Sequence, residues 1–203
     1  LQVRDFGEDE RSVYLVTDLI EGPSLRQVMA EHGPLPWERA SRIVHQMLDA
    51  ASALHARGGF VCGINPDMVR MTRTPDGAER VVMSSAGIRS VQDVLATMRE
   101  QELRGQQASE TELPYLAPEV MMGSAPDARA DVFTIAALAY QLVSGRVPFT
   151  AGSLPQLIGQ MLQHPPAVPD ALPPAVQAAL LTALDSTPAR RFQTAHDFQH
   201  ALA

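Results

Sequence analysis

The residues of this chain that could carry out chemistry are few, and the stretch that most resembles a site is residues 58–72, GGFVCGINPDMVRMT. It has two short apolar runs, Phe60–Ile64 and Met68–Met71, around a Pro-Asp turn. This rhythm is typical of a catalytic loop from which the reactive side chains have been removed. The single cysteine, Cys62, has no Lys, Arg or His beside it in the sequence, so we interpret it as a buried structural residue.

Composition excludes several classes of protein. The chain has 203 residues, a net charge of -7 and a pI of about 5.3, which argues against a nucleic-acid-binding surface. One cysteine allows no internal disulfide, and the histidines lack the spacing of a metal site. No apolar run could span a bilayer, so we expect a cytoplasmic protein or the cytoplasmic part of a larger membrane-anchored one. Because the chain enters in mid-strand without a start methionine, we interpret it as a fragment.

The elements that must position the 58–72 stretch begin with a β-hairpin. Residues 1–6 and 13–20 are strand-like and flank an acidic turn, and two such strands need something to pack on. Residues 60–72 and 80–83 are predicted to be extended, with the turn TPDGAE before the second.

The rest of the chain is predicted to be helical. Residues 24–32 form a short helix, and a long helix starting at Pro36 or Trp37 carries one buried stripe. That stripe comprises Ala40, Ile43, Val44, Met47, Leu48, Ala51 and Leu54. Further helices are predicted at 131–144, 154–163, 174–184 and 194–203, with a weaker one at 91–104 and a polar tract at 105–112. The prediction is one hairpin followed by an α-rich domain of about seven helices.

Four segments in this order resemble the eukaryotic-type (Hanks-type) serine/threonine protein kinases. They are VYLVTDLIEGPSLRQVM, LPYLAPEV, DARADVFTIAALAYQLVSGRVPF and DSTPARRFQTAHDF. The resemblance runs from residue 1 to residue 203 and implies a mainly α fold: a kinase-like large lobe at 23–203, preceded by a remnant of the small lobe, two strands and the hinge, at 1–22.

The resemblance also implies three structural residues. Glu119, in the intact Ala117-Pro118-Glu119 triplet, should pair with Arg191. Asp131 should accept backbone hydrogen bonds from the 61–64 loop, as an anchor.

The residues that perform phosphoryl transfer in that family are replaced here. By resemblance, Gly63 stands at the catalytic base, Asn65 at the phosphate-contacting lysine, Met68 at the metal-binding asparagine and Ser85 at the main metal carboxylate. A thioether is unsuited to Mg²⁺, which prefers oxygen ligands. We therefore expect no catalytic residue and no bound metal. Asp67 lies beside the Met68 position, but successive residues of an extended segment point to opposite faces.

Nucleotide binding is left open by the sequence. The hinge, Asp18–Ile20, could offer backbone groups to a base, whereas Arg70 stands where the family has an apolar residue under the adenine. A cationic side chain packs poorly against the apolar face of an adenine unless it stacks on that base. The alternative is that the Arg70 side chain bends out to solvent.

Three hypotheses follow. The first is a pseudokinase, a regulatory or scaffolding module in signalling with no cofactor and with a protein partner such as a kinase or another signalling protein. The second is a weak or atypical ATP- and Mg²⁺-dependent kinase, or another phosphoryl or nucleotidyl transferase, whose carboxylates come from unexpected positions such as Asp67 or Asp76. The third is a helical adaptor outside the family. The Ala-, Pro- and Arg-bearing style of the chain suggests a bacterial protein.

Overall fold

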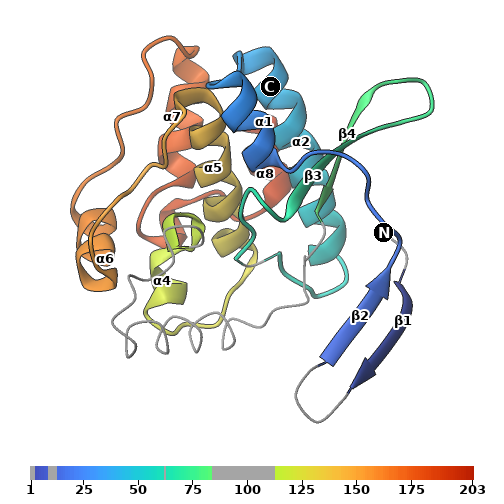
Figure 1. Ribbon diagram of the computed structural model, residues 1–203. Coiled ribbons are helices and arrows are strands. Elements are labelled where there is room, and N and C mark those ends of the chain that lie inside the picture. The colour runs from blue at the N-terminus through green and yellow to red at the C-terminus, as the bar shows by residue number, and fades with distance from the viewer. Residues whose placement is uncertain (1–2, 9–12, 62, 84–112) are drawn as a thin grey trace.

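The computed structural model describes residues 3–8, 13–61, 63–83 and 113–203. The predictions for residues 91–104 and 105–112, and for Cys62 and Ser85, lie outside these ranges. The fold is mainly α: a helical body is preceded by a β-hairpin, which is the order of elements that the resemblance implies (Figure 1). Seven α-helices and two small antiparallel sheets are present in the described residues.

The first sheet is the predicted hairpin. Strands β1 (Val3–Glu8) and β2 (Val13–Thr17) pair antiparallel, with Phe6 opposite Leu15 and Glu8 opposite Val13. The strand β1 extends two residues past the predicted end at Phe6, and β2 stops three residues before the predicted end at Ile20. The hairpin stands apart from the helical body, and Phe6 and Tyr14 are exposed (Figure 1).

The second sheet lies on the helical body. Strands β3 (Val69–Arg73) and β4 (Glu79–Met83) pair antiparallel around a turn, with Arg70 opposite Val82. The sequence analysis predicted extended structure from residue 60, but the strand begins only at Val69. Residues 66–68 form a turn at the predicted Pro-Asp position, because Asn65 and Pro66 favour a turn there.

The two central helices are α2 (Trp37–His55) and α5 (Ala128–Ser144), which pack against each other. The predicted stripe of α2 is buried from Ala40 to Ala51, and Leu54 is partly buried against the same core. Helix α5 is buried on nearly all sides, as predicted. It begins three residues before the predicted start at Asp131, because the Asp127 side chain accepts a hydrogen bond from Arg129 N at 2.8 Å and caps it.

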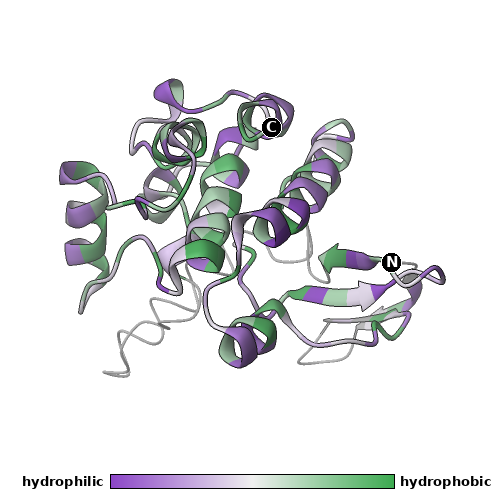
Figure 2. Ribbon diagram, turned by 90° about the horizontal axis from the view of Figure 1, so that it is seen from above, coloured by the Kyte–Doolittle hydropathy of each residue, from purple (hydrophilic) through white to green (hydrophobic). Residues whose placement is uncertain are grey.

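The remaining helices surround this pair. Helix α1 (Leu25–His32) begins with a capping box in which Ser24 and Gln27 exchange side-chain and backbone hydrogen bonds. The others are α4 (Pro118–Met121), α6 (Leu154–Gln163), α7 (Pro174–Ala183) and α8 (Ala195–Ala201), with 3-10 turns η1 (Leu113–Tyr115) and η2 (Pro188–Arg190). Figures 1 and 2 both place α6 and the β1–β2 hairpin on opposite sides of the body. Within the described residues, no helix is both long and apolar enough to cross a membrane.

Candidate functional site

The candidate site is built around residues 63–68, which we call the 63–68 loop, and residues 22–24, which follow the hinge and contact β3. Gly63 is buried and has a φ of 75°, a backbone conformation that favours glycine. The position that the resemblance assigns to a catalytic base therefore has no side chain, and it has a backbone that most other residues would adopt only with strain.

Asn65 shapes the loop. Its side chain is 4% exposed, and its Oδ1 accepts a hydrogen bond from Asp67 N at 2.9 Å. Its carbonyl oxygen also accepts from Met68 N at 3.0 Å. This is an Asx turn, in which the side chain imitates a turn of the backbone. Asn65 is thus engaged within the loop itself, at the position where the resemblance would place a phosphate-contacting lysine.

Asp67 and Met68 point in different directions. The Asp67 carboxylate accepts a hydrogen bond from Arg26 Nε, on α1, at 2.7 Å, while Met68 packs against the core. We expected these two side chains to diverge because neighbours in an extended strand point to opposite faces. They diverge, but on a turn, since residues 66–68 are not extended. The Arg26–Asp67 pair is half-exposed, with side-chain exposures of 38% and 51%, so it orients the carboxylate more than it stabilises the fold.

Tyr115 lies beside this pair. Its hydroxyl donates to Gln141 Oε1 at 2.7 Å, and burial raises its pKa to about 12. The positive charge of Arg26 lowers that pKa and the negative charge of Asp67 raises it, but burial outweighs both. Arg26 Nη2 is buried without a hydrogen-bond partner. The 63–68 loop is therefore held from α1, by the Arg26 side chain on Asp67 and the Arg26 N–H on Pro66 O.

The segment after the hinge touches β3. Gly22 has a φ of 128°, and a Cβ there would lie 2.0 Å from the Met71 carbonyl oxygen, so only glycine fits. Met71 N donates to Pro23 O at 2.9 Å, and Ser24 forms a bridge with Arg70. The half-buried Arg70 side chain donates through Nη1 to Gly22 O at 3.3 Å. Its guanidinium is thus tied to the segment that follows the hinge.

The hinge residues Asp18 and Ile20 are partly buried, and Leu19 between them is exposed. Asp18 accepts a hydrogen bond from Arg4 Nε at 2.6 Å, and Leu19 is 87% exposed. Asp76, the other carboxylate considered above, lies in the exposed turn between β3 and β4, where the Thr74 hydroxyl lowers its pKa. Within the described ranges, no group of three or more His, Cys, Asp or Glu side chains could hold a metal ion.

Two buried ionic anchors support this site. Arg191 donates from Nη1 and Nη2 to the two carboxylate oxygens of Glu119, both at 2.7 Å, which is the pairing the resemblance implied. Asp131 is fully buried and accepts from Val61 N at 2.6 Å, just before the 63–68 loop. The same Asp131 Oδ2 lies 2.7 Å from His55 Nε2 on α2.

Comparison with known proteins decides the family. The chain is 29% identical over 208 residues to the serine/threonine-protein kinase PknJ of Mycobacterium tuberculosis. It is 31% identical over 188 residues to the serine/threonine-protein kinase PkaA of Streptomyces coelicolor and 32% identical over 194 residues to the serine/threonine-protein kinase Pkn1 of Myxococcus xanthus. These alignments cover 99%, 93% and 93% of the chain.

The chain belongs to the Hanks-type serine/threonine protein kinase family. It spans 34%, 33% and 27% of the lengths of these three bacterial kinases. No protein-family model matches it.

In this kinase-family chain, sequence reasoning missed two residues that the structure brings to the site. His55 falls four residues after Ala51 and seven after Leu48, so the buried stripe of α2 could have predicted that it faces the core. Arg26 gave no such signal, because its partner Asp67 is 41 residues away. Ser85 lies outside the described residues.

Proposed function

We propose that this chain is a pseudokinase domain, which regulates or scaffolds a signalling partner and does not transfer phosphate. The observation that carries the proposal is the state of the 63–68 loop. Gly63 offers no base, Asn65 is committed to its own turn, and Met68 offers a thioether that packs on the core. Losing a general base alone lowers a rate by about 10²–10⁴.

The contrast with the anchors supports the same proposal. Glu119, Arg191 and Asp131 keep their buried contacts, so the residues that hold the lobe together are present while those that would act on a phosphate are replaced. This pattern is typical of a domain that offers a stable binding surface, and not of an enzyme that turns over a substrate. We propose a protein partner, such as an active kinase or another signalling protein, in the cytoplasm.

The test is a phosphorylation assay. The full-length protein is incubated with labelled ATP and with Mg²⁺ or Mn²⁺, beside an Asp67→Asn variant that removes the loop's one carboxylate. We expect no incorporation above the buffer blank in either protein. Robust incorporation that is lost in the Asp67→Asn variant would overturn the proposal, because it would show that the chain itself catalyses the transfer.

The alternative function is a weak or atypical phosphoryl or nucleotidyl transferase that uses ATP and Mg²⁺. One observation favours it: the Asp67 carboxylate is half-exposed beside the Met68 position, and Arg26 is its one ion-pair partner in the part of the chain that the structure describes. The relatives are also named as kinases. Asp76 is a poorer candidate, since it lies in the exposed turn of the β3–β4 hairpin.

Thermal-shift titration separates the two functions. A ligand that binds only the folded state stabilises it by RT ln(1 + [L]/Kd), so a true cofactor raises the Tm. A pseudokinase that has lost nucleotide binding shows no shift with millimolar ATP and Mg²⁺. A metal-dependent shift that disappears in the Asp67→Asn variant favours the transferase.

A further inference from the structure

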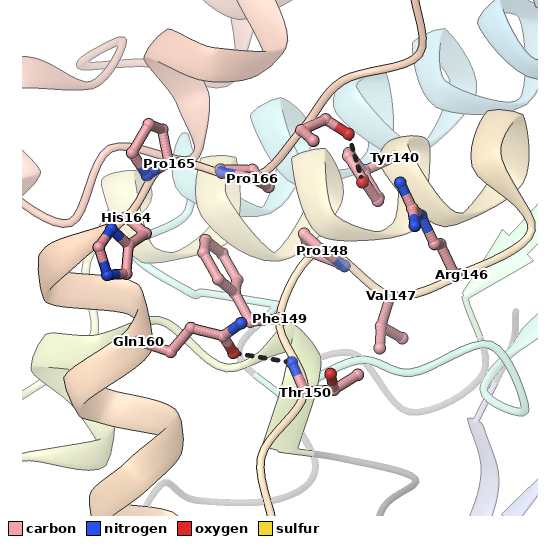
Figure 3. A pocket seen from close by; sticks show the side chains of 11 residues that line it. Tyr140, Arg146, Val147, Pro148, Phe149, Thr150, Gln160, His164, Pro165 and Pro166 are labelled. Carbon is pink, nitrogen blue, oxygen red and sulfur yellow. Dashed lines mark hydrogen bonds between the residues drawn. The ribbon is translucent and has the colours of Figure 1, made fainter.

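A second concave site lies outside the hinge and the 63–68 loop. It is a pocket of about 270 Å³ between α5, the segment 146–150, the C-terminal half of α6 and the segment 164–167 (Figure 3). Seven of its eleven lining residues are apolar or aromatic, among them Tyr140, Pro148, Phe149 and Pro166. The other lining residues, Arg146, Thr150, Gln160 and His164, give the walls a comparable share of polar surface, so a ligand there needs both an apolar part and a polar group.

The walls of the pocket are fixed before any ligand arrives. Gln160 Oε1, on α6, accepts a hydrogen bond from Thr150 N at 3.0 Å, and the Tyr140 hydroxyl, on α5, donates to Ala167 O at 2.7 Å (Figure 3). These bonds join α6 to the 146–150 segment and α5 to the 164–167 segment. A preformed site loses little conformational entropy when a ligand binds.

Arg146 gives the pocket its charge. The Ser144 hydroxyl holds the Arg146 backbone, donating to its O at 2.8 Å and accepting from its N at 3.2 Å. The guanidinium has no carboxylate within salt-bridge distance among the described residues, and no Asp or Glu lines the pocket. In a chain of net charge -7, a cation at the edge of a pocket that no Asp or Glu lines is available to an anionic ligand.

We propose that this pocket binds a small aromatic carboxylate. A dry cavity of about 150 Å³ holds a benzene ring, so this pocket of about 270 Å³, which opens to solvent, has room for one ring and a short acidic side arm. The ring packs on the prolines and Phe149, and the carboxylate pairs with Arg146. His164 lies across the pocket from Arg146, at the C-terminal end of α6 (Figure 3). The carbonyl groups there disfavour an anion, so the carboxylate lies on the Arg146 side.

The probe for this site is 3-phenylpropanoate, and its matched neutral control is 3-phenylpropanamide. Both are titrated into the isotopically labelled protein, and backbone amide shifts are followed by NMR. We expect saturable shifts at Thr150 and at its neighbours in the 146–150 segment, with the amide binding at least about tenfold more weakly because it cannot form the charge-assisted pair.

Three variants locate the binding. Arg146→Gln raises the Kd for 3-phenylpropanoate about tenfold, whereas Arg190→Gln, the same change at an exposed arginine of η2, leaves it unchanged. Ala167→Phe fills the pocket with a side chain and abolishes the shifts. All three positions are exposed, and circular dichroism confirms that each variant folds. No saturable shift in the 146–150 segment, equal binding of the amide, or binding that survives Ala167→Phe would each overturn the proposal.

Discussion

Arg191 uses all five of its N–H groups, and two of them reach the two carboxylate oxygens of Glu119. Beyond that bidentate pair, Nε donates to Asp185 O at 2.7 Å, Nη1 to Arg129 O at 3.2 Å and Nη2 to Ser186 O at 3.3 Å. The guanidinium also lies 4.9 Å from the centre of the Phe133 ring, which stacks on Phe149. One buried side chain therefore joins α4, α5 and the segment before α8.

Removing this arginine should be one of the costliest single changes in the chain. Arg191→Met leaves Glu119 with an unpaired and mostly buried charge, so we expect the free energy of unfolding to fall by about 3–5 kcal/mol. Urea denaturation followed by circular dichroism measures the loss. Arg190→Gln, at the exposed neighbouring position, should change stability by less than about 0.5 kcal/mol. A loss below about 1 kcal/mol for Arg191→Met would contradict a central role for the pair.

Local signals predicted most of the fold, and long-range contacts account for most of what the sequence missed. Helix α6 has the predicted bounds, Leu154–Gln163, because the proline in its first turn and its amphipathic period are both local signals. The Pro-Asp turn was predicted from its residue types and lies at 66–68, whereas the extended structure expected from residue 60 begins only at Val69. The contacts Arg26–Asp67 and His55–Asp131 join residues 41 and 76 positions apart, and no periodic pattern encodes such pairs.

Asp131 should control the order of the segment before the 63–68 loop. In an Asp131→Asn variant the amide retains one acceptor oxygen without the charge, so the bonds to Val61 N and His55 weaken together. We expect a loss of about 1.5–3 kcal/mol in the free energy of unfolding and much faster hydrogen exchange at Val61 N–H. The amide of Leu157, in the middle of α6, serves as an internal control. Unchanged protection at Val61 would show that another group holds that segment.

The Arg39–Glu79 pair should make stability depend on acid pH. Arg39 Nη2 donates to Glu79 Oε1 at 2.7 Å and joins α2 to β4, and this hydrogen bond holds the pKa of Glu79 below its usual range. A lowered pKa means that its stabilisation is present above the unfolded value of 4.5 and is lost as the pH falls through the folded value. Since both side chains are partly exposed, we expect at most about 1 kcal/mol.

Chemical denaturation at several pH values between neutral and strongly acidic tests this pair. The wild-type chain should lose stability more steeply than Glu79→Gln, which has no carboxylate to protonate at this position. The two proteins should converge at the acid end. Parallel curves over the whole range would mean that the Arg39–Glu79 contact contributes nothing measurable.

Gly63 should resist the restoration of a catalytic base. Its φ of 75° lies in the left-handed region, which costs an ordinary L-residue roughly 1–2 kcal/mol. Gly63→Val should therefore destabilise the chain by about that amount or more, while Gly63→Asn, of similar size, should lose less, because Asn tolerates this conformation. Gly63→Asp alone should yield no transfer of phosphate from ATP, since Asn65 and Met68 remain.

Gly159 provides the matched contrast. It lies inside α6, and a Cβ there would meet nothing within 4 Å, so Gly159→Ala should stabilise the chain by about 0.5–1 kcal/mol. The urea midpoint should be highest for Gly159→Ala, followed by the wild type, then Gly63→Asn, and lowest for Gly63→Val. Equal midpoints for Gly63→Asn and Gly63→Val would mean that side-chain volume, and not the left-handed backbone, decides what this position accepts. Phosphate transfer by Gly63→Asp would show that the loop needs only its base to become active.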